Sequence, residues 1–346
     1  MLLDLDERLH RPDKMFVLAE VLAEAGVPAA TLLEGSGLAP ADLQQAATRV
    51  SIAQLLAVCE RARRLSPDPA LALRAGLRTR ITHFGLYGYA LLASPTPRQA
   101  IEVALRYRAL ASPLIGLGFA VDGDEAVWSF DDPLDLGPAS AAFRFVVELQ
   151  LGTLLALHRD LLGPTLAPRR VRLRQGAPAH AGAYPALLHC PADFEQTADE
   201  LRFDAVWLDR PLAFANPASA EAARRTCEQQ LAEMDGAAGL AGRVARRLLR
   251  TPGRFPDLPA VAAELGLHPR TLRRHLQAGG RSFQQLRDEV RLKMARDYLR
   301  DTRLSTEDIA AALGFSDAAN FRHAFKRWSG QAPATWRQAQ RGARPA

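Results

Sequence analysis

The chain has 346 residues, of which 48% are hydrophobic and 24% charged, and its formal net charge is +6. This length corresponds to about two domains and is sufficient to bury cores without disulfide bonds. The three cysteines are scattered and show no metal-binding spacing, which argues against a secreted disulfide framework (Cys59, Cys190, Cys227). We find no pattern of a signal peptide and no long uncharged apolar segment, so we expect a cytoplasmic protein without a membrane partner.

The net charge hides an asymmetry between the two ends of the chain. Residues 240–346 contain 21 Lys and Arg against 9 Asp and Glu, which gives +12, whereas residues 1–239 contain 23 against 29, which gives −6. A basic block beside an acidic block predicts a nucleic-acid-binding module next to a domain with another task. The alternative at this point is an arginine-rich, solvated surface.

From the N-terminus, residues 13–80 show helical periodicity. Met15, Leu18 and Leu22 lie on one helix face, and the pattern stops at Gly26-Val27-Pro28. Further helices are expected in four ranges: 40–45, 52–66, 87–92 and 99–110.

Beyond Pro113 the period changes. The apolar runs 114–121 and 126–130 flank Asp122-Gly123-Asp124-Glu125, which predicts a β-hairpin. Short strands are also expected at 170–174, 193–195 and 200–203, and helices at 140–162 and 184–189. These elements predict an α+β domain with a small antiparallel sheet.

A helix predicted over 216–234 is followed by Asp235-Gly236-Ala237-Ala238-Gly239, where the charge balance also changes. Glycine loosens the chain there, so we expect a domain boundary. The predicted organisation is a sensing and dimerisation domain over 10–215, a linker helix and hinge over 216–239, and a DNA-binding domain over 240–340.

The basic domain contains one helical pattern twice, at 258–277 and 306–328. In each copy a short helix ends at Leu-Gly, and a second helix rich in Arg and His follows the turn. This is typical of a helix-turn-helix, which reads DNA with its second helix. A continuous helical pattern over 282–299 joins the copies as a rod of about 27 Å, close to the roughly 34 Å between successive major-groove faces. We therefore expect an all-α domain whose two helix-turn-helix units contact adjacent groove segments.

The residues facing outward on the two recognition helices are the expected DNA contacts. Pro269 suits the first position of the first helix, and Ser316 is the expected N-cap of the second. At about 100° per residue, the outward positions are Arg270, Arg273, Arg274 and Gln277 in the first helix and Ala319, Arg322, His323 and Lys326 in the second, with Asn320 on its flank. For any single arginine the alternative is ordinary solvated surface.

The second copy resembles the signature of AraC/XylS-type transcription regulators. The resemblance is carried by Ile309-Ala310, Leu313-Gly314-Phe315-Ser316-Asp317, Phe321, Ala324-Phe325-Lys326-Arg327-Trp328, Gly330, Pro333 and Arg337. Leu272-Arg273-Arg274 and Gly280-Arg281-Ser282-Phe283 fit the first half of that domain. The resemblance implies promoter DNA as a partner and base-facing residues at Arg270, Arg273, Arg274, Ala318, Asn320 and His323. One departure is His323, where the family usually has arginine.

The N-terminal half resembles the arabinose-binding-like sensor domain of some of these regulators. The matching segments are His83-Phe84-Gly85, Ala93-Ser94-Pro95-Thr96, Cys190-Pro191 with Phe194, and Phe203 with Leu208-Asp209-Arg210-Pro211-Leu212. The helix-rich pattern argues against an all-β cupin sensor, and the family name does not imply arabinose. The resemblance implies an unidentified small-molecule effector, a homodimer and RNA polymerase as partners.

Four residues are candidates for the effector site: His83, Tyr87, Tyr107 and Trp128. For each, the alternative that outweighs a ligand contact is an ordinary core residue with a satisfied hydrogen bond, because pockets are few per protein. We find no catalytic constellation, metal-ligand spacing or phosphate-binding loop, so we expect no cofactor and no enzyme. Cys190 beside His189 is rejected as a nucleophile pair because adjacent side chains rarely aim at each other.

The sequence therefore predicts a DNA-binding transcription regulator controlled by an effector in its N-terminal domain. Two alternatives stay open. The N-terminal half could only oligomerise an effector-independent DNA binder, or it could be an enzyme with an accessory DNA-binding domain.

Overall fold

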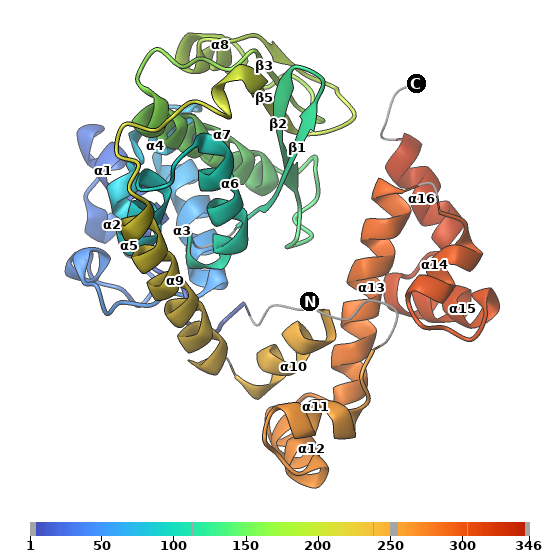
Figure 1. Cartoon of the computed structure of the whole chain (residues 1–346). Coiled ribbons are helices and arrows are strands. Elements are labelled where there is room, and N and C mark those ends of the chain that lie inside the picture. The colour runs from blue at the N-terminus through green and yellow to red at the C-terminus, as the bar shows by residue number, and fades with distance from the viewer. Residues whose placement is uncertain (1–4, 112–113, 238, 250–254, 303, 343–346) are drawn as a thin grey trace. The chain divides into compact units, whose positions relative to one another are not determined.

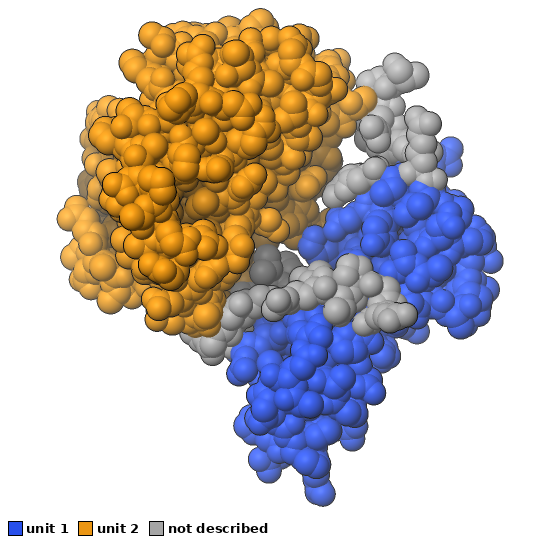
Figure 2. Space-filling model, in the orientation of Figure 1, with its two compact units in different colours: residues 1–4, 234–346 blue, residues 5–233 orange. Residues whose placement is uncertain are grey.

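The structure, a computed structural model, describes residues 5–111, 114–237, 239–249, 255–302 and 304–342. The chain divides into one unit over Leu5–Glu233 and a second that contains the chain from Met234 onward (Figure 2). The first unit combines helices with a sheet and the second is helical, which confirms the predicted fold class.

The first unit is mainly helical around one large core. Its helices are α1 Asp13–Glu24, α2 Ala29–Leu33, α3 Ile52–Leu65, α4 Leu71–Arg78, α5 Gly85–Leu92, α6 Pro97–Arg106, α7 Ala141–Leu162 and α8 Ala183–Leu188, with 3₁₀ turns η1 Pro40–Gln44, η2 Ile81–Phe84, η3 Arg108–Ala111 and η4 Ala205–Trp207. Side-chain capping fixes the residue at which several of these helices begin. At α3, Ser51 Oγ accepts from the Gln54 N–H (3.1 Å) and Gln54 Oε1 accepts from the Ser51 N–H (2.9 Å), which forms a capping box.

Helix α7 is the central element of this unit and crosses α4 closely (Figure 1). A Cβ at Gly152 would lie 2.5 Å from the Leu73 carbonyl oxygen, and one at Gly76 would lie 2.3 Å from that of Leu149. Only glycine permits such an approach, so the two backbones pack directly against each other.

The expectation that no segment is apolar enough to span a membrane was wrong for α7. Ala141–Leu162 is long and apolar enough, but 72% of its apolar window is buried inside the unit. Its composition follows from its central position, because a helix surrounded by protein is apolar on all sides.

The sheet has five strands in the order β1-β2-β5-β3-β4. They are β1 Gly116–Asp122, β2 Glu125–Asp131, β3 Arg170–Arg172, β4 Ala192–Asp193 and β5 Glu200–Asp204. The predicted hairpin is present as β1 and β2, and Gly123 has the positive φ of +61° that the tight turn requires. The prediction of an antiparallel sheet was wrong for one pair: β3 and β4 are parallel, because α8 lies in the connection between them and returns the chain to the same end.

Helix α9, Pro217–Ala237, leads from the first unit into the second. The break predicted from Asp235 was placed too early, since the helix continues to Ala237, and Gly239 is non-helical. One helical glycine costs only about 1 kcal/mol, which an established helix tolerates. Residue 238 of the expected break lies outside the described residues.

The second unit has two small cores on one long helix (Figure 1). Its helices are α10 Leu240–Leu249, α11 Leu258–Glu264, α12 Pro269–Ala278, α13 Phe283–Asp301, α14 Thr306–Ala312, α15 Ala318–Ser329 and α16 Pro333–Gly342. Helix α13 contributes Leu286 and Val290 to the core shared with α11 and α12, and Ala295 and Leu299 to the core shared with α14 and α15. With 19 residues, it is about 29 Å long.

Candidate nucleic-acid interface and ligand cavity

Helix α12 presents a basic face opposite its buried face. The His268 ring accepts a hydrogen bond from the Arg270 N–H (3.3 Å), and Pro269 occupies the first turn as predicted. Leu272 and Leu276 are buried, which fixes the rotation of the helix. The opposite face is exposed and consists of Arg270, Arg273, Arg274 and Gln277.

The side chains of this basic face are available for binding. Across the described residues, none of the four side chains makes a hydrogen bond or an ion pair. Three permanently charged guanidinium groups on one helix face can donate to phosphates or, in pairs of N–H groups, to guanine edges.

The N-cap of α15 is Asp317 rather than the predicted Ser316. Asp317 Oδ1 accepts from the Asn320 N–H (2.7 Å), and this hydrogen bond lowers the pKa of the Asp317 carboxyl. Both residue types are good N-caps, but the chain enters the helix one residue later than the pattern suggested. Ser316 instead accepts from the Asn320 amide nitrogen (2.9 Å), as does Asp317 (2.8 Å). The Asn320 amide nitrogen is therefore engaged in the cap.

The outward face of α15 is less basic than that of α12. Ala319, Asn320, Arg322, His323 and Lys326 are exposed, whereas Ala318 is half-buried and packs against the second core. Arg322 lies 3.8 Å from Glu307 on α14. Within the described ranges, His323 and Lys326 have no side-chain partner, so they are the freer groups of this face.

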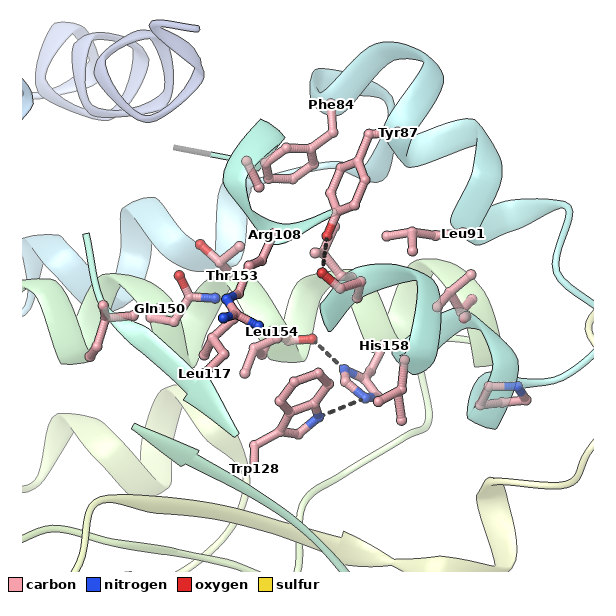
Figure 3. Close-up of a pocket in the computed structure, with 18 of the residues that line it drawn as sticks. Phe84, Tyr87, Leu91, Arg108, Leu117, Trp128, Gln150, Thr153, Leu154 and His158 are labelled. Carbon is pink, nitrogen blue, oxygen red and sulfur yellow. Dashed lines mark hydrogen bonds between the residues drawn. The ribbon is translucent and has the colours of Figure 1, made fainter. Parts of the chain in front are cut away.

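The first unit contains a mostly apolar cavity between α5, α6, α7 and the β1–β2 hairpin (Figure 3). It encloses about 790 Å³, counting the space open to solvent. Its lining is Lys14, Phe84, Tyr87, Leu91, Pro97, Ala100, Ile101, Ala104, Arg108, Ala111, Ile115, Leu117, Trp128, Gln150, Thr153, Leu154, Leu157, His158 and Leu161. A concave, mainly apolar site with a few polar groups is typical of small-molecule binding.

Two of the four predicted effector residues line this cavity. The Tyr87 hydroxyl donates to the Ala104 carbonyl (3.3 Å), and burial raises the pKa of the phenol. The Trp128 indole N–H donates to His158 Nε2 (3.3 Å). Burial lowers the pKa of His158 to about 4, so this ring is neutral at physiological pH.

The other two predicted residues lie elsewhere. His83 is half-buried, accepts from the Arg80 N–H (3.2 Å) and packs edge-on against Phe16. The Tyr107 hydroxyl donates to Glu228 of α9 (3.1 Å). Both rings therefore have structural contacts of their own and are not among the residues that line the cavity.

Sequence reasoning missed five polar residues of the cavity wall: Lys14, Arg108, Gln150, Thr153 and His158. Gln150 is 8% exposed and sits within the apolar run of α7. A polar residue inside the mainly apolar stretch of α7 was the available signal, because a polar side chain there needs a hydrogen-bond partner from the protein, water or a ligand.

The described residues contain no metal-binding cluster, and the three cysteines are buried. No group of three or more His, Cys, Asp or Glu side chains in these ranges could hold a metal ion. Cys59, Cys190 and Cys227 are buried, and burial raises the pKa of each thiol, to about 12 for Cys59 and about 11 for Cys190. A thiol with a raised pKa is a poor nucleophile.

Both units match known families. Residues 26–212 match the family described as the arabinose-binding domain of AraC transcription regulators, N-terminal. Residues 261–339 match a helix-turn-helix domain family.

Relatives are similar over nearly the whole chain. The ornithine utilization regulator of Pseudomonas aeruginosa is 36% identical over 93% of this chain and 94% of its own length. An uncharacterized HTH-type transcriptional regulator of Mycobacterium tuberculosis is 31% identical over 92% of this chain and 94% of its own length. The crystal structure of the transcriptional regulator CdpR from Pseudomonas aeruginosa covers 94% of this chain and 98% of its own, at 25% identity and a TM-score of 0.48.

Proposed function

The chain belongs to the AraC family of transcription regulators, and from this premise we propose that a small molecule bound in the cavity of the first unit controls binding of the second unit to promoter DNA. Residues 10–215 sense the effector and dimerise, residues 216–239 link, and residues 240–340 bind DNA. RNA polymerase is the further partner, and the protein acts in the cytoplasm as a regulator and not as an enzyme.

The observation that carries the DNA-binding proposal is the exposed basic face of α12. Arg270, Arg273, Arg274 and Gln277 have exposed side chains that are unpartnered within the described residues. The outward residues of α15 supply a second, weaker contact: Ala318, Ala319, Asn320, Arg322, His323 and Lys326. The length of α13, about 29 Å, supports a fit of both helices to successive major-groove segments of one DNA face.

A nuclease footprint on DNA flanking the chain's own gene tests this proposal. We expect a discrete protected patch of about two helical turns per monomer, because two recognition helices occupy adjacent grooves. The double substitution Arg273→Ala and Arg274→Ala should abolish site selection without unfolding the protein, since both side chains are exposed.

The matched control is Arg225→Ala, an exposed arginine of α9 that forms an ion pair with Glu221 (3.9 Å) within its own helix. It should leave the footprint intact. Retention of the footprint by the folded double mutant would overturn the assignment of α12.

The cavity favours the effector-controlled alternative over a DNA binder whose N-terminal half only oligomerises. A ligand that binds only the native state raises its apparent stability. A thermal-shift screen followed by a footprint with each hit therefore separates the two. Hits that raise the melting temperature and change the footprint support control by an effector.

A further inference from the structure

The cavity has a polar end built around η3. Lys14 Nζ donates to the Ala111 carbonyl of that turn (2.8 Å), and Arg108 belongs to the same turn and donates to the Leu105 carbonyl (3.1 Å). Figure 3 shows the Arg108 guanidinium and the Gln150 side chain pointing into the same part of the cavity, away from Leu91.

Both cations lack a carboxylate partner. Asp13, the neighbour of Lys14 on α1, is held by Arg11 (3.2 Å). Among the described residues, no carboxylate lies within 4.0 Å of Lys14 or Arg108. Each cation uses one donor on a backbone carbonyl and keeps further N–H donors available.

Gln150 has an unused polar group as well. Its side chain is 8% exposed and lines the cavity, yet within the described ranges it has no hydrogen-bond partner. Among the described residues, its amide atoms are not buried atoms without a partner, so the amide opens onto accessible space and can donate a hydrogen bond to a ligand.

The rest of the cavity is mostly apolar, with side chains such as Leu91, Ile101 and Leu117. The polar atoms of Tyr87, Trp128, Thr153 and His158, which also line it, already have hydrogen-bond partners. No aspartate or glutamate is among the described residues that line it. The cavity therefore offers donors and positive charge at one end and an apolar body elsewhere.

We propose that the effector is an apolar monocarboxylate whose carboxylate binds Lys14, Arg108 and Gln150 while its hydrocarbon body fills the apolar part of the cavity. The inference rests on the proposed function and names the chemical class of its effector. Arginine binds carboxylates through two parallel N–H donors, and the lysine and the amide add further donors. Ornithine, which the name of one relative suggests, would place its α-ammonium group beside these cations and its δ-ammonium group in the apolar part, and no described lining residue is an acidic partner for either.

Calorimetric titration of the full chain tests the proposal with four probes. Octanoate and 4-phenylbutyrate represent an aliphatic and an aromatic source of the same chemistry. Octan-1-ol replaces the carboxylate with a neutral hydroxyl, and ornithine has a carboxylate but carries two ammonium groups and no apolar body. We expect at least one of the acids to bind about tenfold or more tightly than octan-1-ol, and ornithine not to bind. Equal binding of octanoate and octan-1-ol without binding of 4-phenylbutyrate, or binding of ornithine alone, would overturn the proposal.

Substitutions of the polar end sharpen the test. Arg108→Met and Gln150→Leu should each lower the affinity for the acid by about tenfold and leave the affinity for octan-1-ol unchanged. Arg49→Met is the matched control, since Arg49 is likewise exposed and donates to nearby backbone carbonyls (2.8 and 2.9 Å). An equal loss of affinity for the acid and for octan-1-ol would show that these residues have only a structural role, and would reject the proposal.

Failure of this inference is distinguishable from failure of the proposed function. The footprint without ligand reports on DNA binding alone and does not depend on the cavity. A chain that gives a discrete footprint but binds neither acid remains a regulator with an effector of another class.

Discussion

The indole N–H of Trp128 donates a hydrogen bond to Nε2 of His158 over 3.3 Å, in the wall of the cavity. An indole nitrogen only donates, so Nε2 must accept. The ring proton is therefore on Nδ1, which donates to the Leu154 carbonyl (2.7 Å). This pair fixes a neutral His158 and joins the hairpin to α7.

Replacing His158 with Leu should lower the free energy of unfolding by about 1–3 kcal/mol, because the buried Trp128 N–H loses its acceptor. The measurement is urea unfolding of the two proteins and of a double-mutant cycle with Trp128→Phe. We expect His158→Leu to cost less in the Trp128→Phe background, where no donor is left unpaired. If the two substitutions lowered the free energy of unfolding additively, the hydrogen bond between Trp128 and His158 would be contradicted.

Stability should fall in acid because of two buried histidines. Burial lowers the pKa of both His10 and His158 from 6.5 to about 4. Between these values the unfolded chain takes up a proton that the folded chain does not, so the stabilisation is full above pH 6.5 and declines as the pH falls toward 4. At pH 5 each histidine should have lowered the free energy of unfolding by about 2 kcal/mol relative to its value above pH 6.5.

Urea unfolding from pH 7 to pH 4.5 checks this prediction, with His158→Leu as the comparison. The stability gap between the native chain and the variant should narrow as the pH falls, since the variant lacks one of the two groups. Parallel curves would show that His158 does not titrate as its burial requires.

The crossing of α4 and α7 should be intolerant of any side chain. Gly152→Ala would place a methyl group 2.5 Å from the Leu73 carbonyl oxygen, so we expect a loss of about 2 kcal/mol or more. Gly182→Ala is the control, because Gly182 has a φ of −62° and a methyl group there would meet no atom within 4 Å. Thermal unfolding should separate the two variants clearly; similar melting temperatures would disprove the close packing.

Local patterns explain which parts of the fold were predictable. The hairpin and both helix-turn-helix units follow from periodicity and turn residues within short stretches of chain. The choice between Ser316 and Asp317 as N-cap did not, because adjacent residues of equal capping ability leave the entry of the chain undecided. The parallel pairing of Val171 with Ala192 depends on a long-range connection that no local pattern encodes.

The same distinction between local and long-range structure applies to the candidate site residues. The outward face of α12 is a property of one helix, so Leu272 and Leu276 were enough to orient it. The cavity is assembled from several elements, and its polar residues become visible only when these pack together. Aromatic character therefore selected Trp128, which lines the cavity, but also Tyr107, which is not among its lining residues and whose hydroxyl contacts Glu228.

Arg291 of α13 connects the two helix-turn-helix units. Its guanidinium lies over the rings of Phe255 (5.1 Å) and Phe315 (4.7 Å), which pack against the first and second core respectively, and it donates to the Gly314 carbonyl (3.2 Å). Arg291→Met should lower the unfolding free energy of the second unit of the chain by about 1–2 kcal/mol. It should also weaken operator binding, because the two helix-turn-helix units are then held less rigidly relative to each other.

The control for Arg291 is Lys293→Met on the same helix, which removes an i,i+4 ion pair with Asp297 (3.2 Å). Such surface pairs contribute about 0.5 kcal/mol or less. Urea unfolding and operator titration should therefore distinguish the variants, and equal losses would argue against a bridging role for Arg291.

Replacing His323 with Arg should give the second helix-turn-helix specificity for a DNA base. His323 is exposed on the outward face of α15 and has no partner among the described residues. A neutral imidazole offers one donor, whereas arginine is always charged and can bind guanine through two N–H groups, worth about 1–3 kcal/mol of discrimination. Selection from a randomised DNA library should enrich guanine at one position for the variant. His275→Arg adds the same charge away from the outward face of α12, so it should tighten binding without that enrichment; enrichment by both variants would mean that charge alone is responsible.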